Sequence, residues 1–422
     1  MGEVLEKATQ ARAAAQKLAK TDATTRNKAL EAMAQALENN AEYLIAENAK
    51  DVEAARAKGT EEPLIDRLLL NEARIKGIAD ALRILAKEND PLGKIVSGRT
   101  LYNGIKMRQV TVPLGVVAMI YEARPNVTAD AAGLTLKTGN ACILRGGSMA
   151  NHSNLSMTKV LYEAGIEAGL PEFWLQSIET TDRVATTELM HLHGMIDVLI
   201  PRGSASLIRT TVENSRVPVI ETGEGNCHLY IHEAADQAIV LPIAVNAKIQ
   251  RPGVCNAIET ILIDEAVAPL YIPQLLETLA SYNVKFHVDD AVFALALQLS
   301  DEVTSRLNRA TEDDWGTEYL NLEIAIKCVK GIDEAIEHIN RYGTHHSDSI
   351  LSKDIAVVAR FLNEVDSAAV YANASTRFTD GGEFGLGAEI GISTQKLHAR
   401  GPMGLDALTS TKYVLEGSGQ IR

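Results

Sequence analysis

One cysteine, Cys255, stands on a segment whose composition suits nucleophilic chemistry. Residues 250–257, hereafter the cysteine turn, lie between a helical pattern and an apolar strand pattern. Pro252 has a fixed φ and no N–H, and Gly253 is conformationally free, so the pair predicts a sharp turn after the helix. Arg251 and the backbone N–H groups of such a turn can lower the pKa of a thiol, and the thiolate is the reactive form. The alternative is a small apolar side chain that fills the core.

Two glycine-containing loops have the composition of anion-binding sites. Arg145-Gly146-Gly147-Ser148 and Pro201-Arg202-Gly203-Ser204 each follow an apolar strand pattern and precede a helical one. Glycine lets a ligand approach the backbone, and free N–H groups at a helix start bind phosphate. Neither loop matches the Rossmann or P-loop fingerprint, and each alone fits an ordinary strand-to-helix turn equally well. A dinucleotide would use both loops.

Three more polar residues follow predicted strands. Glu221 begins a glycine-rich segment, where its carboxylate either acts on a site or caps the turn. Arg124 and Asn126 follow the 116–121 strand pattern and offer a cation and an amide donor to an anionic substrate.

The histidine pairs do not predict a metal site. His191 and His193, and likewise His345 and His346, have no third and fourth ligand at a suitable spacing. We therefore predict solvated or packed histidines and no bound metal.

The predicted elements place these residues in an α/β protein. Residues 3–90 show amphipathic helical periodicity. Residues 94–112 read as a two-stranded ribbon with little core of its own, which predicts an arm that packs on a neighbouring subunit. Short apolar strands then alternate with helices, which predicts parallel sheets whose ligands lie at the carboxyl ends of the strands. The predicted strands are 116–121, 141–145, 173–178, 196–200 and 217–220, and then 258–264, 284–288, 319–329, 347–351 and 368–373.

Length and charge narrow the classes of function. With 422 residues the chain exceeds one hydrophobic core, so two or three domains are expected. The formal net charge of −14 disfavours nucleic acid or an anionic membrane as partner, so an anionic ligand must meet a local cluster of cations. Four cysteines without CxxC spacing, no signal-peptide pattern and no 18-residue apolar run predict a soluble, cytoplasmic protein with reduced thiols.

With its motifs and predicted elements in this order, the chain resembles the aldehyde dehydrogenase superfamily over essentially its whole length. Cys255 follows Glu221 by 34 residues, a separation similar to that between nucleophile and base in the superfamily. The motifs that carry the resemblance lie at 112–117, 136–141, 203–204, Glu221, Cys255, 322–324, 334–336 and 341–344. Segments 121–128, 250–256 and 378–394 narrow it to the family that reduces L-glutamyl 5-phosphate.

The resemblance implies roles for individual residues. Cys255 becomes the nucleophile, and Glu323 holds the nicotinamide ribose. Arg145 stands where the superfamily usually has a lysine that touches the adenosine ribose, and Ser148 stands where NAD-preferring enzymes usually have a glutamate. This exchange favours NADPH, since it adds a cation and removes a carboxylate near the 2′-phosphate. The other residues that the resemblance assigns to the cofactor are Lys137, Gly146, Gly147, Gly203 and Ser204.

The chain departs from the superfamily at the oxyanion donor. The usual proline-tryptophan-asparagine segment is replaced by residues 122–126, and Asn126 is the candidate counterpart of the asparagine. The implied reaction is NADPH-dependent reduction of L-glutamyl 5-phosphate to L-glutamate 5-semialdehyde and phosphate through a thioester on Cys255, in proline biosynthesis. Arg124 and Arg251 are candidates for binding the substrate. In this reaction Glu221 need not activate water.

Two other functions stay open from the sequence. A hydrolytic aldehyde dehydrogenase would use Glu221 as its base, and a catalytically idle protein would only bind a dinucleotide or act as a scaffold. For the favoured enzyme we expect a dinucleotide-binding domain (1–96 and 113–226), a catalytic domain (227–384), and an oligomerisation arm with a C-terminal extension (97–112 and 385–422). The expected partners are a small-molecule substrate, a second copy of the chain in a dimer or tetramer, and glutamate 5-kinase.

Overall fold

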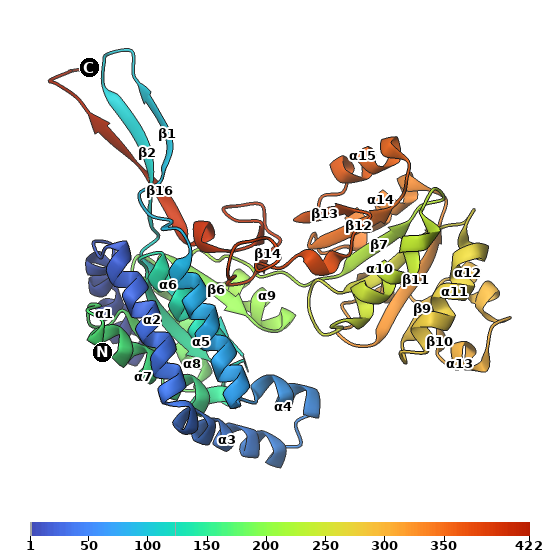
Figure 1. Cartoon of the computed structure of the whole chain (residues 1–422), viewed down its shortest axis with the longest axis horizontal. Helices are drawn as coiled ribbons and strands as arrows, with labels where there is room; N and C mark the ends of the chain where they lie inside the picture. Colours follow the sequence, from blue (N-terminus) through green and yellow to red (C-terminus); the bar gives the residue numbers. More distant parts are fainter. Residues whose placement is uncertain (1, 123) are drawn as a thin grey trace. The chain divides into compact units, whose positions relative to one another are not determined.

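Two compact units make up the chain. The computed structural model describes residues 2–122 and 124–422 (Figure 1). Unit 1 comprises Met1–Thr222, Gly385–Gly391 and Met403–Arg422, and unit 2 comprises Gly223–Phe384 and Ile392–Pro402. The last segment, which the sequence assigns to a C-terminal extension, belongs to unit 2, where the short strands β14 (Ile392–Ser393) and β15 (Gly401–Pro402) pair with each other. No helix among the described residues has the length and apolar character needed to cross a membrane.

Helices form the first part of unit 1, as their periodicity predicts. Asp22 and Asn71 cap two of them, because each side chain accepts a backbone N–H three residues later at 2.8 Å. The apolar stripes that predicted these helices, including Leu30, Leu37 and Leu82, are buried. The helices are α1 (Glu3–Leu18), α2 (Ala23–Asn39), α3 (Ala41–Ala57), α4 (Glu62–Leu68) and α5 (Glu72–Lys87).

A four-stranded parallel sheet in the order β5-β4-β3-β6 follows in unit 1. Tyr121 at the end of β3 pairs with Gly146 at the end of β4 and with Arg202 at the end of β6, so these three strands end at one edge. The expected strand at 217–220 is reduced to an isolated bridge. The strands are β3 (Val116–Tyr121), β4 (Ala141–Gly146), β5 (Leu175–Ser177) and β6 (Val198–Arg202). The connections are α6 (Asn126–Lys137), η1 (Ser148–Ala150), α7 (Asn151–Glu167), α8 (Arg183–His191) and α9 (Ala205–Asn214).

The predicted ribbon projects from the rest of unit 1 (Figure 1). Strands β1 (Ile95–Thr100) and β2 (Lys106–Pro113) pair antiparallel, and β16 (Thr409–Glu416), which follows η4 (Leu405–Leu408), adds a third strand along the whole of β2. Most of its side chains are exposed, since three strands alone enclose no core.

Unit 2 is built on a seven-stranded parallel sheet in the order β10-β9-β11-β8-β7-β12-β13. Its strands are β7 (Cys227–Ile231), β8 (Ile258–Asp264), β9 (Lys285–Val288), β10 (Leu307–Arg309), β11 (Glu323–Val329), β12 (Ser347–Leu351) and β13 (Ala369–Ala372). Its helices are α10 (Gln237–Ile249), α11 (Ala268–Ala280), α12 (Asp290–Ala296), α13 (Asp301–Thr304), η2 (Asp313–Gly316), α14 (Ile332–Tyr342), α15 (Ile355–Glu364) and η3 (Thr376–Phe378).

Two strands of this sheet were missed from the sequence, and one is shorter than predicted. The buried strand β7 contains Cys227 and His228, which interrupt the apolar run that signals a strand. The edge strand β10 has only three residues. The predicted strand at 319–329 begins only at Glu323, because Leu320 has a positive φ of 55° that ends extended pairing there. The fold class is therefore α/β with two parallel sheets and a β arm, as predicted.

Candidate active site

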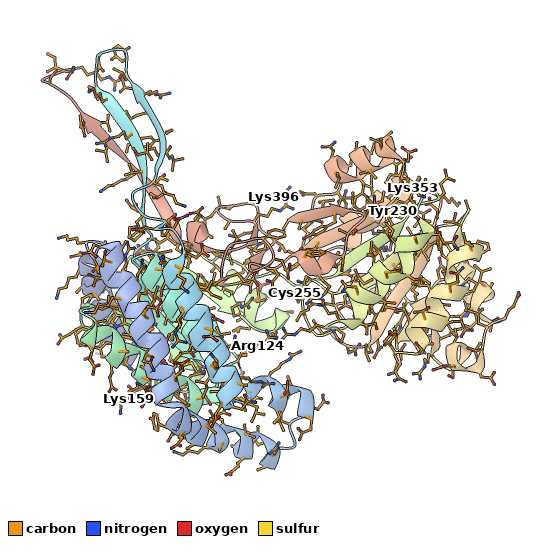
Figure 2. The ribbon with its side chains drawn as sticks, viewed as in Figure 1. Arg124, Lys159, Tyr230, Cys255, Lys353 and Lys396 are labelled. Atoms are coloured by element: carbon orange, nitrogen blue, oxygen red, sulfur yellow. The ribbon has the colours of Figure 1, made fainter. Side chains whose placement is uncertain are left out.

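The cysteine turn has the predicted form. Helix α10 ends at Ile249, and the N–H of Ala257 donates to the carbonyl of Val254 at 3.0 Å just before β8 begins. Cys255 is a half-buried residue on this turn, labelled in Figure 2. The other three cysteines are buried, and burial raises the pKa of Cys142 and Cys328 to about 12. Of the four thiols, Cys255 is the one with access to a substrate.

A neighbouring loop holds the backbone of Cys255 in place. A Cβ added at Gly225 would lie 1.5 Å from the Cys255 carbonyl oxygen, so the two backbones are in direct contact. The Gly225 N–H donates to Glu318 Oε1 at 2.7 Å, and the Cys227 thiol donates to the Cys255 carbonyl at 3.1 Å. Only glycine fits at position 225, because any side chain would displace the backbone of Cys255.

Glu323 lies at the same edge of the sheet as the cysteine turn. Strand β11, which it begins, runs parallel to β8, which begins just after the turn. His287 Nε2 lies 3.0 Å from Glu323 Oε2, and Lys285 Nζ lies 3.6 Å from Oε1. Burial alone would raise the pKa of Glu323, but His287 and Lys285 bring the net pKa below its usual value. The carboxylate is therefore charged and half-exposed, as an acceptor for ribose hydroxyls must be.

These residues lie at the amino ends of the unit 2 strands, where the general rule for parallel sheets would not place them. Cys255 comes before β8 and Glu323 is the first residue of β11. The carboxyl-end rule describes ligands bound by loops that follow strands. In unit 2 the candidate nucleophile is instead on a loop that enters a strand.

Arg377 is a candidate residue that the sequence reasoning missed. It lies on η3, is half-buried, and donates from Nε to Gln250 Oε1 at 3.1 Å. Burial lowers its pKa, and the charge of Arg251 lowers it further. Arg251 itself is exposed. The available signal was position, since Arg377 immediately precedes the 378–394 segment that narrowed the family resemblance.

The two glycine loops of unit 1 come together at the carboxyl edge of its sheet. They follow β4 and β6, which flank β3, and Ser148 and Ser204 are exposed on them. Between them Glu122, also missed from the sequence, accepts the Ser204 N–H at 3.1 Å and the Ser204 Oγ–H at 2.8 Å. A Cβ at Gly203 would lie 2.6 Å from the Glu122 carboxyl carbon. The start of α9 thus has the hydrogen-bond donors that an anion requires, and in this structure the Glu122 carboxylate accepts from them.

Two residues assigned to the cofactor have other roles. Lys137 Nζ donates to Asn27 Oδ1 and to the carbonyls of Ala86 and Glu88, at 2.6 to 3.1 Å. It ends α6 at the amino edge of the sheet, away from the glycine loops, so no contact in this structure supports its assignment to the cofactor site. Lys137 was assigned to the cofactor because it lies in a family motif. In the structure its hydrogen bonds connect α6 to the N-terminal helices.

Arg145 lies at the correct edge, but its guanidinium faces the protein backbone. It donates to the carbonyl of Gly146 and, at 3.0 and 3.3 Å, to those of Thr181 and Asp182. Only 7% of the residue is exposed, and burial lowers its pKa. In this conformation the side chain supports the loop and does not present donors to a 2′-phosphate.

The remaining candidates of unit 1 lie near the ends of its strands. Arg124, labelled in Figure 2, follows β3 in the loop to α6, and Ala123 of the same motif lies outside the described residues. Asn126 is exposed at the start of α6 and donates from Nδ2 to Asp130 Oδ2 at 3.0 Å. Desolvation raises the pKa of Asp130 to about 6. Glu221 is half-buried near the end of unit 1.

Within the described ranges, no group of three or more His, Cys, Asp and Glu side chains is placed to hold a metal ion.

Comparison with known proteins places the chain in a family. The model of the aldehyde dehydrogenase family matches residues 2–313. A γ-glutamyl phosphate reductase of Caldanaerobacter subterraneus is 51% identical over 420 residues, covering 100% of both chains. The crystal structure of γ-glutamyl phosphate reductase from Thermotoga maritima has a TM-score of 0.95 at 43% identity, with full coverage of both chains. An engineered glycolyl-CoA reductase with bound NADP+ shares the fold, with a TM-score of 0.68 at 14% identity and coverage of 97% and 96%. Aldehyde dehydrogenases use NAD or NADP. The chain therefore belongs to the aldehyde dehydrogenase family and, within it, to the γ-glutamyl phosphate reductases.

Proposed function

We propose that this chain reduces L-glutamyl 5-phosphate to L-glutamate 5-semialdehyde and phosphate, the second step of proline biosynthesis from glutamate. The observation that supports this function is the half-buried Cys255 on a turn that contains Arg251, with Arg377 of η3 hydrogen-bonded to Gln250 of the same turn. A nucleophilic thiol beside two cations suits an acyl group whose leaving group is an anion.

Cys255 performs the covalent chemistry. Its thiolate attacks the acyl carbon, a C–S bond forms, and phosphate leaves with the electron pair of the broken C–O bond. The oxyanion of the tetrahedral intermediate is proposed to accept from the Cys255 backbone N–H and from the side-chain amide of Asn126. A bound nicotinamide dinucleotide supplies the hydride that brings the acyl group to the aldehyde level. Cys255 then leaves as a thiolate, and Glu221 has no water to activate because the thioester is not hydrolysed.

The dinucleotide is proposed to bind through both glycine loops and Glu323. Ser204 can donate two hydrogen bonds to a phosphate once the Glu122 carboxylate moves away. We favour NADPH, because Ser148 leaves the ribose end without a carboxylate that would repel a 2′-phosphate. A Ser148→Glu variant should lose at least tenfold in affinity for NADPH and gain relative preference for NADH.

The exposed three-stranded arm supports a proposal about how the chain assembles. The exposed side chains of β1, β2 and β16 are proposed to pack on another copy of the chain in a dimer or tetramer. We also propose that the enzyme acts in the cytoplasm with glutamate 5-kinase as a partner, since acyl phosphates hydrolyse readily in water.

The test is the reverse reaction, with and without inorganic phosphate. Wild-type enzyme should reduce NADP with glutamate 5-semialdehyde only when phosphate is present, whereas a hydrolytic aldehyde dehydrogenase would not need phosphate. Cys255→Ser should lose several orders of magnitude in kcat while still binding NADPH. Activity of this variant within about tenfold of wild type would contradict covalent catalysis.

A further inference from the structure

We propose that Arg377 binds the phosphate group of the substrate beside Cys255, an assignment that rests on the function proposed above. Neither the family motifs used above nor the candidates Arg124 and Arg251 include this residue.

Hydrogen bonds connect the segment that contains Arg377 to the cysteine turn. Thr376 Oγ1 donates to the Asn256 carbonyl at 2.7 Å. In return Asn256 Nδ2 donates to the carbonyl of Thr379 at 2.8 Å and to that of Arg377 at 3.4 Å. These bonds reach the residue directly after the nucleophile, so Arg377 keeps its place relative to Cys255.

The side chain of Arg377 reaches back along the same turn. Its Nε donates to Gln250 Oε1 at 3.1 Å, at the start of the cysteine turn, while its backbone is tied to Asn256 near the end. The guanidinium interacts electrostatically with both Cys255 and Arg251. Because Nε is used, the two Nη groups remain as a fork, the arrangement that binds two oxygens of one phosphate.

The charge of this fork is not neutralised by a carboxylate ion pair among the residues that the structure describes. Other arginines are neutralised in that way: Arg83 donates to both oxygens of Glu38 at 2.8 and 2.6 Å. Arg377 instead has Arg251 as a like-charged neighbour and only a Coulombic attraction to Asp380. Placing two cations together beside a thiol costs free energy, and a bound dianion offsets that cost.

Of the two anionic ends of the substrate, the phosphate is the one that fits this position. It is bonded through oxygen to the carbon that Cys255 attacks, whereas three carbons separate that carbon from the α-carboxylate. As the C–S bond forms and the C–O bond breaks, the electron pair moves onto the phosphate oxygen. Two N–H donors from Arg377 stabilise that added charge where it develops.

The experiment compares Arg377→Gln and Arg377→Lys with Arg360→Gln, which removes an exposed arginine of α15 in the same unit. Two measurements use inorganic phosphate as the probe: its KM in the reverse reaction, and the concentration that half-protects Cys255 from alkylation by iodoacetamide without any dinucleotide. Arg377→Gln should raise both values at least tenfold and change the semialdehyde KM by less than about twofold. Arg377→Lys should fall between it and wild type, because an ammonium offers no fork. Arg360→Gln should match wild type.

The outcomes distinguish the role of Arg377 from the proposed reaction. In one outcome, wild type requires phosphate while Arg377→Gln keeps the wild-type phosphate KM and half-protecting phosphate concentration. That result would overturn the role of Arg377 and leave the proposed function in place. A rise in the semialdehyde KM instead would assign Arg377 to the α-carboxylate and also overturn it. A wild-type reaction that ignores phosphate would overturn the proposed function itself. Should Arg377→Gln fail to fold, Arg377→Lys decides, since an unchanged phosphate KM there excludes a bidentate contact.

Discussion

Replacing Gly225 by alanine is expected to disable Cys255 without touching its side chain. Gly225 lies in the loop before β7, and the Cβ of alanine would stand 1.5 Å from the Cys255 carbonyl oxygen, 2.3 Å from its carbonyl carbon and 2.6 Å from its Cα. All three atoms belong to backbone, so no flexible side chain can move aside. Either the Gly225 loop or the cysteine turn must shift.

The size of the shift follows from the contact distances. Real Cβ atoms do not approach other heavy atoms within 3.0 Å, so the two backbones must separate by at least about 1.5 Å. A reacting group displaced by about 1 Å costs roughly 100-fold in rate. We therefore expect kcat to fall at least 100-fold, equivalent to about 2.7 kcal/mol of transition-state stabilisation. The bond from the Gly225 N–H to Glu318 should also weaken.

The assay is the phosphate-dependent reduction of NADP, together with dinucleotide binding and thermal unfolding. Gly316→Ala is the matched control, because a Cβ there meets no atom within 4 Å. The control should keep wild-type kcat, and Gly225→Ala should keep its affinity for NADPH while losing turnover. If Gly225→Ala retains kcat within threefold of wild type, the contact between this loop and the cysteine turn does not position the nucleophile.

Three other perturbations have defined outcomes. Glu122→Gln should bind NADPH several-fold more tightly by calorimetry, because a carboxylate no longer competes with phosphate for Ser204; weaker binding would show that Glu122 assists the cofactor. Lys248 and Glu259 form an ion pair with both side chains fully buried, so Lys248→Met alone should cost about 3–5 kcal/mol in urea unfolding. The double variant Lys248→Met/Glu259→Leu should lie within about 1 kcal/mol of wild type, and an equal loss in both would contradict this reasoning. His338→Phe should reduce acid sensitivity, since burial lowers the pKa of His338 to about 2, whereas the unfolded side chain takes up a proton below about 6.5. His338 is therefore neutral in both states above pH 6.5 and costs nothing there, but it destabilises the folded chain as the pH falls below 6.5. Between pH 7 and pH 5 the variant should lose about 2 kcal/mol less free energy of unfolding than wild type, measured by urea unfolding.

Local patterns were enough to predict most of the helices and strands and the form of the cysteine turn. Pro252 and Gly253 end a helix wherever they occur, so the cysteine turn has the form that its residue types require. The N-terminal helices and the arm follow from periodicity in the same way. Strand β7 was missed because polar side chains that are buried among partners, such as His228 beside Asp348, look like loop residues in a one-dimensional pattern.

The roles of the charged residues depended on contacts between distant segments. Lys137 and Arg145 were assigned to the cofactor by motif position, but carbonyl groups from other segments had already taken their donors. Glu122 and Arg377 were not singled out from the sequence, and each forms a hydrogen bond with a residue more than 80 positions away. Sequence by itself determined the sharp form of the cysteine turn and the position of the two glycine loops between strand and helix, because proline and glycine set the backbone conformation there. Only the tertiary structure decided which cations and carboxylates remain available to a ligand, because hydrogen-bond donors are satisfied by whichever groups the fold brings near.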